Sequence, residues 1–166
     1  MARVWLLTAI VLALSALPAG GSNARTLIVL DRSIGGVALK ELRSNVEREL
    51  GKGLVLQSTV DKTAKPTPAR STEVSYGSGA LLVYYASAKG FPARAELIET
   101  TATRYQTRFG LGVGSSYPKL VAAGGVDCYG GTECQHGYHT LNKRGTTFWL
   151  DRPHGKVIRI GMTFGH

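Results

Sequence analysis

A pattern of glycine and apolar residues occurs twice in this chain of 166 residues, and the two copies lie 74 positions apart. Gly36-Val37-Ala38-Leu39 is matched by Gly110-Leu111-Gly112-Val113, and each stretch leads into a segment that ends at glycine. An internal repeat indicates two similar structural units that bury their apolar faces against each other. The positions that agree in character are Gly36 with Gly110, Val37 with Leu111, Leu39 with Val113, Val46 with Leu120, and Gly51 with Gly125.

The residues that follow the glycine and apolar pattern predict one short helix in each copy. In the second copy Ser116 is a suitable N-cap, because its hydroxyl can accept a backbone N–H, and Pro118 fits the first turn. In the first copy we expect a helix over residues 43–50, although Leu42 cannot cap it and Ser44 could do so one turn later. Glycines end both segments, as is common after helices.

Segments typical of antiparallel strands follow each helix. The first set is residues 54–60, 73–76, 80–86 and 93–101, with a solvated loop at 61–71 and a hairpin turn at 77–79. The second set is residues 138–141, 146–150 and 156–163. We therefore expect an α+β fold of two similar halves, each a short helix packed on an antiparallel β-meander.

The domain organisation follows from the repeat. We expect a signal peptide at residues 1–24, a first α+β repeat at 25–103, and a second repeat with a cysteine loop at 104–166. Halves of this size have marginal cores, so we expect the two to fold together as one monomer.

The N-terminus has the features of an export signal. Arg3 precedes an apolar run at residues 4–17, which is too short to cross a bilayer core of about 30 Å comfortably. Helix-breaking residues follow, and Ser22-Asn23-Ala24 offers small side chains to a signal peptidase. We predict cleavage before Arg25, a secreted protein and no integral membrane contact; the alternative is a buried N-terminal helix.

These motifs carry a resemblance to a family. Residues 33–39 and 46–51 resemble the first motif of small secreted actinobacterial proteins of unknown role, and residues 99–101, 104–107 and 110–116 resemble the second. The layout is similar to tandem folds of the beta-lactamase inhibitor protein type and to the small outer-membrane assembly lipoproteins. The resemblance implies a binding module, which in the inhibitor branch holds an enzyme loop on the concave face of a combined sheet. It assigns no individual binding residue.

Two cysteines, Cys128 and Cys134, enclose five residues that include two glycines. In an exported chain we expect them to form a disulfide. The alternative is a zinc site that adds His136 and His139 to the two sulfurs. The spacing of these four residues does not match that of the common zinc fingers, so we predict no metal.

Motifs for catalysis are weak. The chain has no Gly-x-Ser-x-Gly elbow. The glycine-rich residues 110–116 lack the third glycine spacing of a dinucleotide site and the lysine of a phosphate loop, and a turn before a helix explains them. We therefore expect no catalytic residue, no cofactor and no enzyme.

Binding is the function that the sequence favours. Tyr84-Tyr85 and Phe148-Trp149 lie on predicted strands, where neighbours face opposite sides, so one of each pair can be an exposed anchor. We select Tyr84, Tyr85, Trp149 and Arg152 as binding candidates, and expect an unknown protein partner. The net charge is +9, or +8 without residues 1–24, so an electrostatic binder of anionic envelope polymer or nucleic acid is the alternative. A metal-dependent hydrolase is the third possibility.

Overall fold

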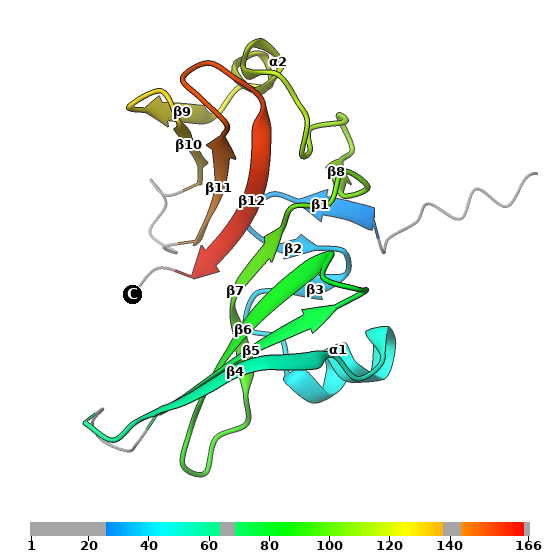
Figure 1. The fold of residues 1–166 in the computed structure, drawn as a ribbon, viewed down its shortest axis with the longest axis vertical. Helices are drawn as coiled ribbons and strands as arrows, with labels where there is room; N and C mark the ends of the chain where they lie inside the picture. The colour runs from blue at the N-terminus through cyan, green and yellow to red at the C-terminus, as the bar shows by residue number, and fades with distance from the viewer. Residues whose placement is uncertain (1–25, 64–68, 138–143, 165–166) are drawn as a thin grey trace, which may run out of the picture.

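The structure, a computed structural model, describes residues 26–63, 69–137 and 144–164 (Figure 1). Most of the described residues belong to two antiparallel or mixed sheets, one of eight strands and one of four. Two short helices accompany them. The expected α+β class is therefore wrong, because this is a mainly β protein.

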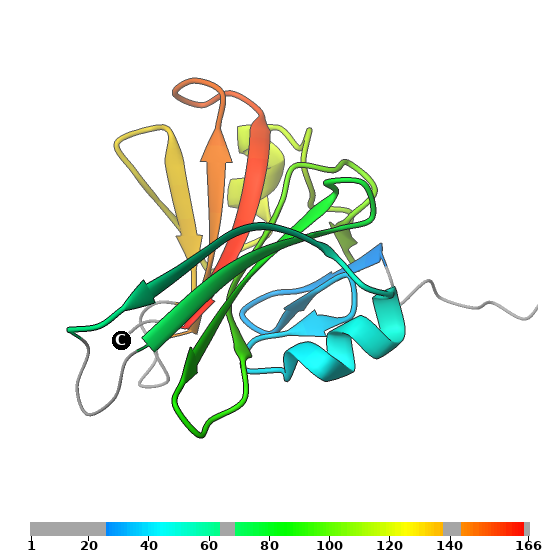
Figure 2. The same cartoon turned by 60° about the horizontal axis from the view of Figure 1, so that its bottom comes forward.

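The large sheet consists of two four-stranded meanders. The first is formed by β4 (Leu54–Asp61), β5 (Ala69–Tyr76), β6 (Leu81–Ala88) and β7 (Arg94–Thr100). The second is formed by β9 (Val126–Tyr129), β10 (Glu133–His136), β11 (Arg144–Leu150) and β12 (Val157–Phe164). The strand order is β4-β5-β6-β7-β12-β11-β10-β9, so the last strands of the two meanders pair with each other. Figure 2 shows the two groups of strands crossing as the sheet twists.

The small sheet has the order β3-β2-β1-β8 and comes from both halves of the chain. Its strands are β1 (Leu27–Val29), β2 (Ser33–Ile34), β3 (Val37–Ala38) and β8 (Gln106–Thr107). Asp31, in the turn after β1, binds the large sheet: its carboxylate accepts a bond from Thr146 Oγ1 at 2.8 Å and pairs with His136 Nδ1 at 2.7 Å. These contacts place the small sheet over one face of the large one, which we call the inward face.

The helices are α1 (Arg43–Leu50) and α2 (Tyr117–Ala122). The α1 range is the predicted one, and α2 ends one turn before Gly125. Leu42 and Ser116 occupy the N-cap positions, and neither makes a side-chain capping bond. Both instead form a single backbone bridge to the start of the last strand of their own meander, Leu42 to Arg94 and Ser116 to Lys156. The capping bond expected from Ser116 is therefore not made, and a backbone bridge holds the start of each helix instead.

Backbone conformation also matches at positions 74 apart. Gly36 and Gly110 have φ of 88° and 72°, and Gly51 and Gly125 have φ of 82° and 65°. Val46 and Leu120 are both buried, at 2% and 0% exposed. The order of helix followed by a four-stranded meander therefore occurs twice, with a glycine of positive φ at equivalent positions before and after each helix.

The expected class was wrong because very short strands escaped recognition. A strand of two to four residues is too short for alternation to be read, so β1, β2, β3, β8, β9 and β10 were not predicted. The loop predicted at 61–71 is also wrong at its end, because β5 begins at Ala69. The strands predicted at 54–60, 80–86, 93–101, 146–150 and 156–163 are confirmed, whereas 138–141 lies outside the described residues.

One hydrophobic core fills the space between the sheets. It contains Ile28 and Ile34 of the small sheet, Val83 and Phe148 of the large sheet, and Leu120 of α2. Among the described residues, no helix is long and apolar enough to cross a membrane.

Candidate functional site: the outer face of the large sheet

The face of the large sheet that points away from the small sheet carries a row of polar and aromatic side chains. Successive side chains of a strand point to opposite faces of the sheet. On β6, buried Val83 and Tyr85 point inward, so Tyr84 between them points outward. Arg43 of α1 lies over the Tyr85 ring, 5.8 Å from its centre, so α1 is on the inward side with the small sheet. We call the outward residues the outer face: Gln57, Thr59, Ser71, Glu73, Leu82, Tyr84, Leu97, Glu99, Glu133, Gln135, Thr147, Trp149, Arg159 and Gly161.

Trp149 and Arg159 form the centre of this face in the second meander. They are direct partners in the β11–β12 register, and the Arg159 guanidinium carbon lies 4.0 Å from the centre of the indole ring. Gly161 provides the room, because a Cβ at that position would lie 2.8 Å from the Trp149 ring. The stacked pair is a flat, preformed contact surface, since each side chain restricts the other.

Glu99 connects the two meanders across the outer face. It lies opposite Gly161 in the β7–β12 register, and its carboxylate is 3.8 Å from Arg159 Nη1. Glu99 is only 9% exposed, and burial raises the pKa of its carboxyl. The Arg159 guanidinium opposes that rise in pKa, and Glu73 adds to it. Glu99 therefore holds a carboxylate where solvation is poor, and its ion pair with Arg159 is long.

Tyr84 and Glu73 form the first-meander part of the face. They are direct partners in the β5–β6 register and line a shallow hollow of about 180 Å³ together with Gln57, Thr59 and Ser71. Burial raises the pKa of the Tyr84 hydroxyl, and the carboxylates of Glu73 and Glu99 raise it further. At neutral pH the phenol therefore keeps its proton and can donate a hydrogen bond.

The outer face has a different charge from the rest of the molecule. The whole chain carries +9, yet the outer-face residues named above include three carboxylates, Glu73, Glu99 and Glu133, and one cation, Arg159. Asp127 of β9, the register partner of Gln135, adds a fourth carboxylate to this face. A ligand that complements this face would therefore be cationic or neutral.

The candidates selected from the sequence fall in three different places. Tyr84 and Trp149 share the outer face, with β7 and β12 between their strands. Tyr85 is 1% exposed on the inward face, where its hydroxyl lies 2.9 Å from that of Tyr76. Arg152 is exposed in the turn between β11 and β12. The outer face thus gathers two of the four candidates.

Sequence reasoning missed Glu73, Glu99 and Arg159. Each reads as an ordinary charged residue on a half-buried strand. Glu73 could have been found, because it precedes core residue Val74 on a strand that alternates. The meeting of Glu99 with Arg159 depends on the β7–β12 pairing, which no local pattern reveals.

The cysteines form the predicted disulfide. Cys128 on β9 and Cys134 on β10 are direct cross-strand partners, with Cα atoms 3.9 Å apart. The bond uses both sulfurs that the zinc alternative requires, and His139 lies outside the described residues. Within the described part of the chain, no three His, Cys, Asp or Glu side chains are grouped so that they could hold a metal ion.

The glycine-rich residues before α2 use their N–H groups within the fold. Gly114 N donates to Val157 O at 2.7 Å, Gly112 N donates to Ser115 Oγ at 3.0 Å, and Tyr117 N donates to Gly155 O at 3.0 Å. A phosphate at this point would have to displace these bonds.

Comparisons with known proteins give little. No protein-family model matches the chain, and no curated protein sequence matches it significantly. A solved structure, that of the uncharacterized protein yfeY from Escherichia coli, aligns with a TM-score of 0.45 and 16% identity. The alignment covers 80% of this chain and 97% of that one.

Proposed function

We propose that this chain is an exported, non-enzymatic binding protein whose outer face holds part of a protein partner. One observation carries the proposal: Trp149 with Arg159, Glu99 and Tyr84 share one face of a sheet whose opposite face holds the core. Tryptophan, tyrosine and arginine are the residues that dominate the energy of protein interfaces. The resemblance to inhibitor-type tandem folds supports the same use of the sheet.

The chemistry of the face suggests what it binds. The stacked Trp149 and Arg159 offer a flat apolar surface, and Tyr84 with Glu73 offers a hydrogen-bond donor beside a carboxylate. A protein loop that carries an aromatic or aliphatic residue and a lysine or arginine complements both parts. Little ordering of side chains is required on binding, because the contacts among these residues already exist in the free protein.

The two alternatives fit this face less well. An anionic polymer would be repelled by Glu73, Glu99 and Glu133, so it would have to bind elsewhere, at cations such as Arg152 and Lys156 in the β11–β12 turn. A metal-dependent hydrolase would need ligands other than the two cysteines, whose sulfurs are bonded to each other.

The test is affinity capture with a double variant. The exported chain and its Tyr84→Ala/Trp149→Ala form are immobilised. Each is then incubated, at low and at high salt, with secreted and cell-surface proteins of the organism that produces the chain. We expect a protein that the wild type retains at both salt concentrations and that the variant retains about tenfold less.

Phe91→Ala is the matched control, because Phe91 is an aromatic residue that is 70% exposed in the β6–β7 turn, away from the outer face. It should retain the partner as the wild type does. Equal retention by the double variant would contradict the proposal. Retention only of polyanions, lost at high salt, would favour the electrostatic alternative.

A further inference from the structure

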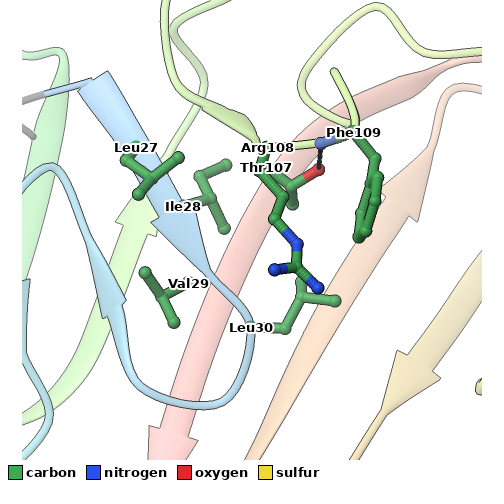
Figure 3. Close-up of a pocket in the computed structure, with 7 residues that line it drawn as sticks. All are labelled: Leu27, Ile28, Val29, Leu30, Thr107, Arg108 and Phe109. Carbon is green, nitrogen blue, oxygen red and sulfur yellow. Dashed lines mark hydrogen bonds between the residues drawn. The ribbon is translucent and has the colours of Figure 1, made fainter. Parts of the chain in front are cut away.

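We propose that a second surface of this protein, centred on Phe109, binds peripherally to anionic lipid. The surface begins with a cleft of about 490 Å³ between β1 and the turn after β8 (Figure 3). Its lining is Leu27, Ile28, Val29, Leu30, Thr107, Arg108 and Phe109. All but two of these side chains are apolar, and the cleft is open to solvent.

A second hollow, of about 350 Å³, adjoins the first, because Phe109 lines both. Leu111, Lys119, Ala122 and Ala123 form the rest of its lining. Phe109 itself is 69% exposed, and Val121 on the neighbouring α2 is 45% exposed. The name Phe109 surface is used below for Phe109, Leu111, Lys119, Val121, Ala122 and Ala123 together with Leu27, Val29 and Leu30. Contiguous exposed apolar area of this kind marks a contact with another molecule or with a membrane.

The turn that carries Phe109 is firmly held. Thr107 Oγ1 accepts bonds from Phe109 N at 3.3 Å and Leu111 N at 3.1 Å, and the first is drawn in Figure 3. Lys119 Nζ donates to Gly110 O at 2.8 Å, which ties the turn to α2. The phenyl ring is therefore displayed on a fixed backbone, and ordering it on binding costs little.

The related turn in the first half lacks the aromatic residue. There Ile34 pairs directly with Val37, so only Gly35 and Gly36 lie between them. In the second half Thr107 N donates to Leu111 O at 2.7 Å, which leaves three residues, 108–110, in the turn. A hairpin of this type thus closes without an exposed phenylalanine, so the fold does not require Phe109.

The charge around this surface selects the kind of ligand. Arg108 lines the cleft and Lys119 lines the second hollow, and neither lining contains an aspartate or glutamate. Arg108 lies over the Phe109 ring, with its guanidinium carbon 4.6 Å from the ring centre. An exposed aromatic residue beside basic side chains is suited to the boundary between acyl chains and anionic headgroups, where each cation contributes about 1 kcal/mol.

Because β1 and β8 belong to the small sheet, the Phe109 surface is distinct from the outer face, and both can be occupied at once.

The experiment measures partition of the exported chain, beginning at Arg25, onto vesicles. This chain keeps every core residue, since the described core extends from Ile28 to Met162. Vesicles of phosphatidylcholine with phosphatidylglycerol are compared with vesicles of phosphatidylcholine alone, by co-sedimentation. We expect binding to the anionic vesicles only, weakened roughly tenfold by Phe109→Ala and about fivefold by Arg108→Gln.

Phe91→Ala is the control, because Phe91 and Phe109 are equally exposed, at 70% and 69%. It should bind vesicles as the wild type does, and circular dichroism establishes that all variants are folded. Equal binding by Phe109→Ala, or no binding of the wild type to anionic vesicles, overturns the proposal. Self-association that Phe109→Ala abolishes, without vesicle binding, would instead identify the surface as a contact between copies.

Discussion

Burial makes the environment of Glu99 unfavourable to its charge. Burial raises the pKa of its carboxyl above the ordinary 4.5, and Arg159 offsets only part of this rise. An acid with a raised pKa in the native state keeps its proton at pH values where the unfolded chain has lost its own. The native protein then binds more protons than the unfolded chain, so the free energy of unfolding falls as pH rises from about 4.5 through the native pKa.

Glu99→Gln removes this titration and keeps the shape of the side chain. We expect the variant to be more stable than the wild type at neutral pH, and the difference to disappear below pH 4.5. Urea unfolding followed by Trp149 fluorescence, at several pH values, measures this, because Trp149 is the single tryptophan after residue 24. Glu49→Gln is the control, because Glu49 is an exposed glutamate on α1. A Glu99→Gln protein less stable than wild type at neutral pH would show that the bond to Arg159 outweighs burial.

At the scale of single residues, the sequence predicted pairs of neighbouring aromatic candidates, and the position of each strand in the sheet determines which member of the pair faces outward. Tyr84-Tyr85 and Phe148-Trp149 had to face opposite sides, but local pattern does not say which member is inward. The core decides this: Val83 and Phe148 are buried at 0% exposure, which directs Tyr84 and Trp149 outward. Arg159 and Glu99 could not be paired in advance, since they meet through a long-range strand contact.

The element that the sequence described least well is the hairpin β9–β10. The disulfide was predicted, but its cysteines were assigned to a loop, whereas Cys134 is fully buried and opposite Cys128 in a strand ladder. The glycines Gly130 and Gly131, both with positive φ, form the turn between these strands. At the sheet edge β9 has one strand partner only, so the disulfide fastens its ladder to β10.

Removing the disulfide should weaken the whole fold moderately. For so short a loop, the chain-entropy model gives about 2 kcal/mol of stabilisation. Cys128→Ala/Cys134→Ala is expected to lower the free energy of unfolding by that amount. Reductant should lower the stability of the wild type toward that of the variant and leave the variant unchanged, which makes the variant its own control. A wild type indifferent to reductant would contradict the expectation.

The whole molecule depends on the junction between its two meanders. Ile98 and Thr100 of β7 pair with Met162 and Ile160 of β12, and the small sheet draws strands from both halves. Sequence periodicity predicted two similar halves that fold together, but it gave too much weight to two short helices. It could not predict the second sheet, because β1 and β8 are brought together from positions about 80 residues apart.

Met162→Ala tests whether the two halves unfold as one unit. Met162 is 0% exposed and lies opposite Ile98, so the cavity should cost about 2–5 kcal/mol. Hydrogen exchange is measured separately on peptides from β5–β6 and from β11–β12. Because one core joins the halves, we expect protection to fall by the same free energy in both peptides. Val60→Ala, 49% exposed near the end of β4, should change neither. Loss of protection in β11–β12 alone would mean that each meander has its own core. The two meanders would then unfold independently, in spite of the β7–β12 pairing.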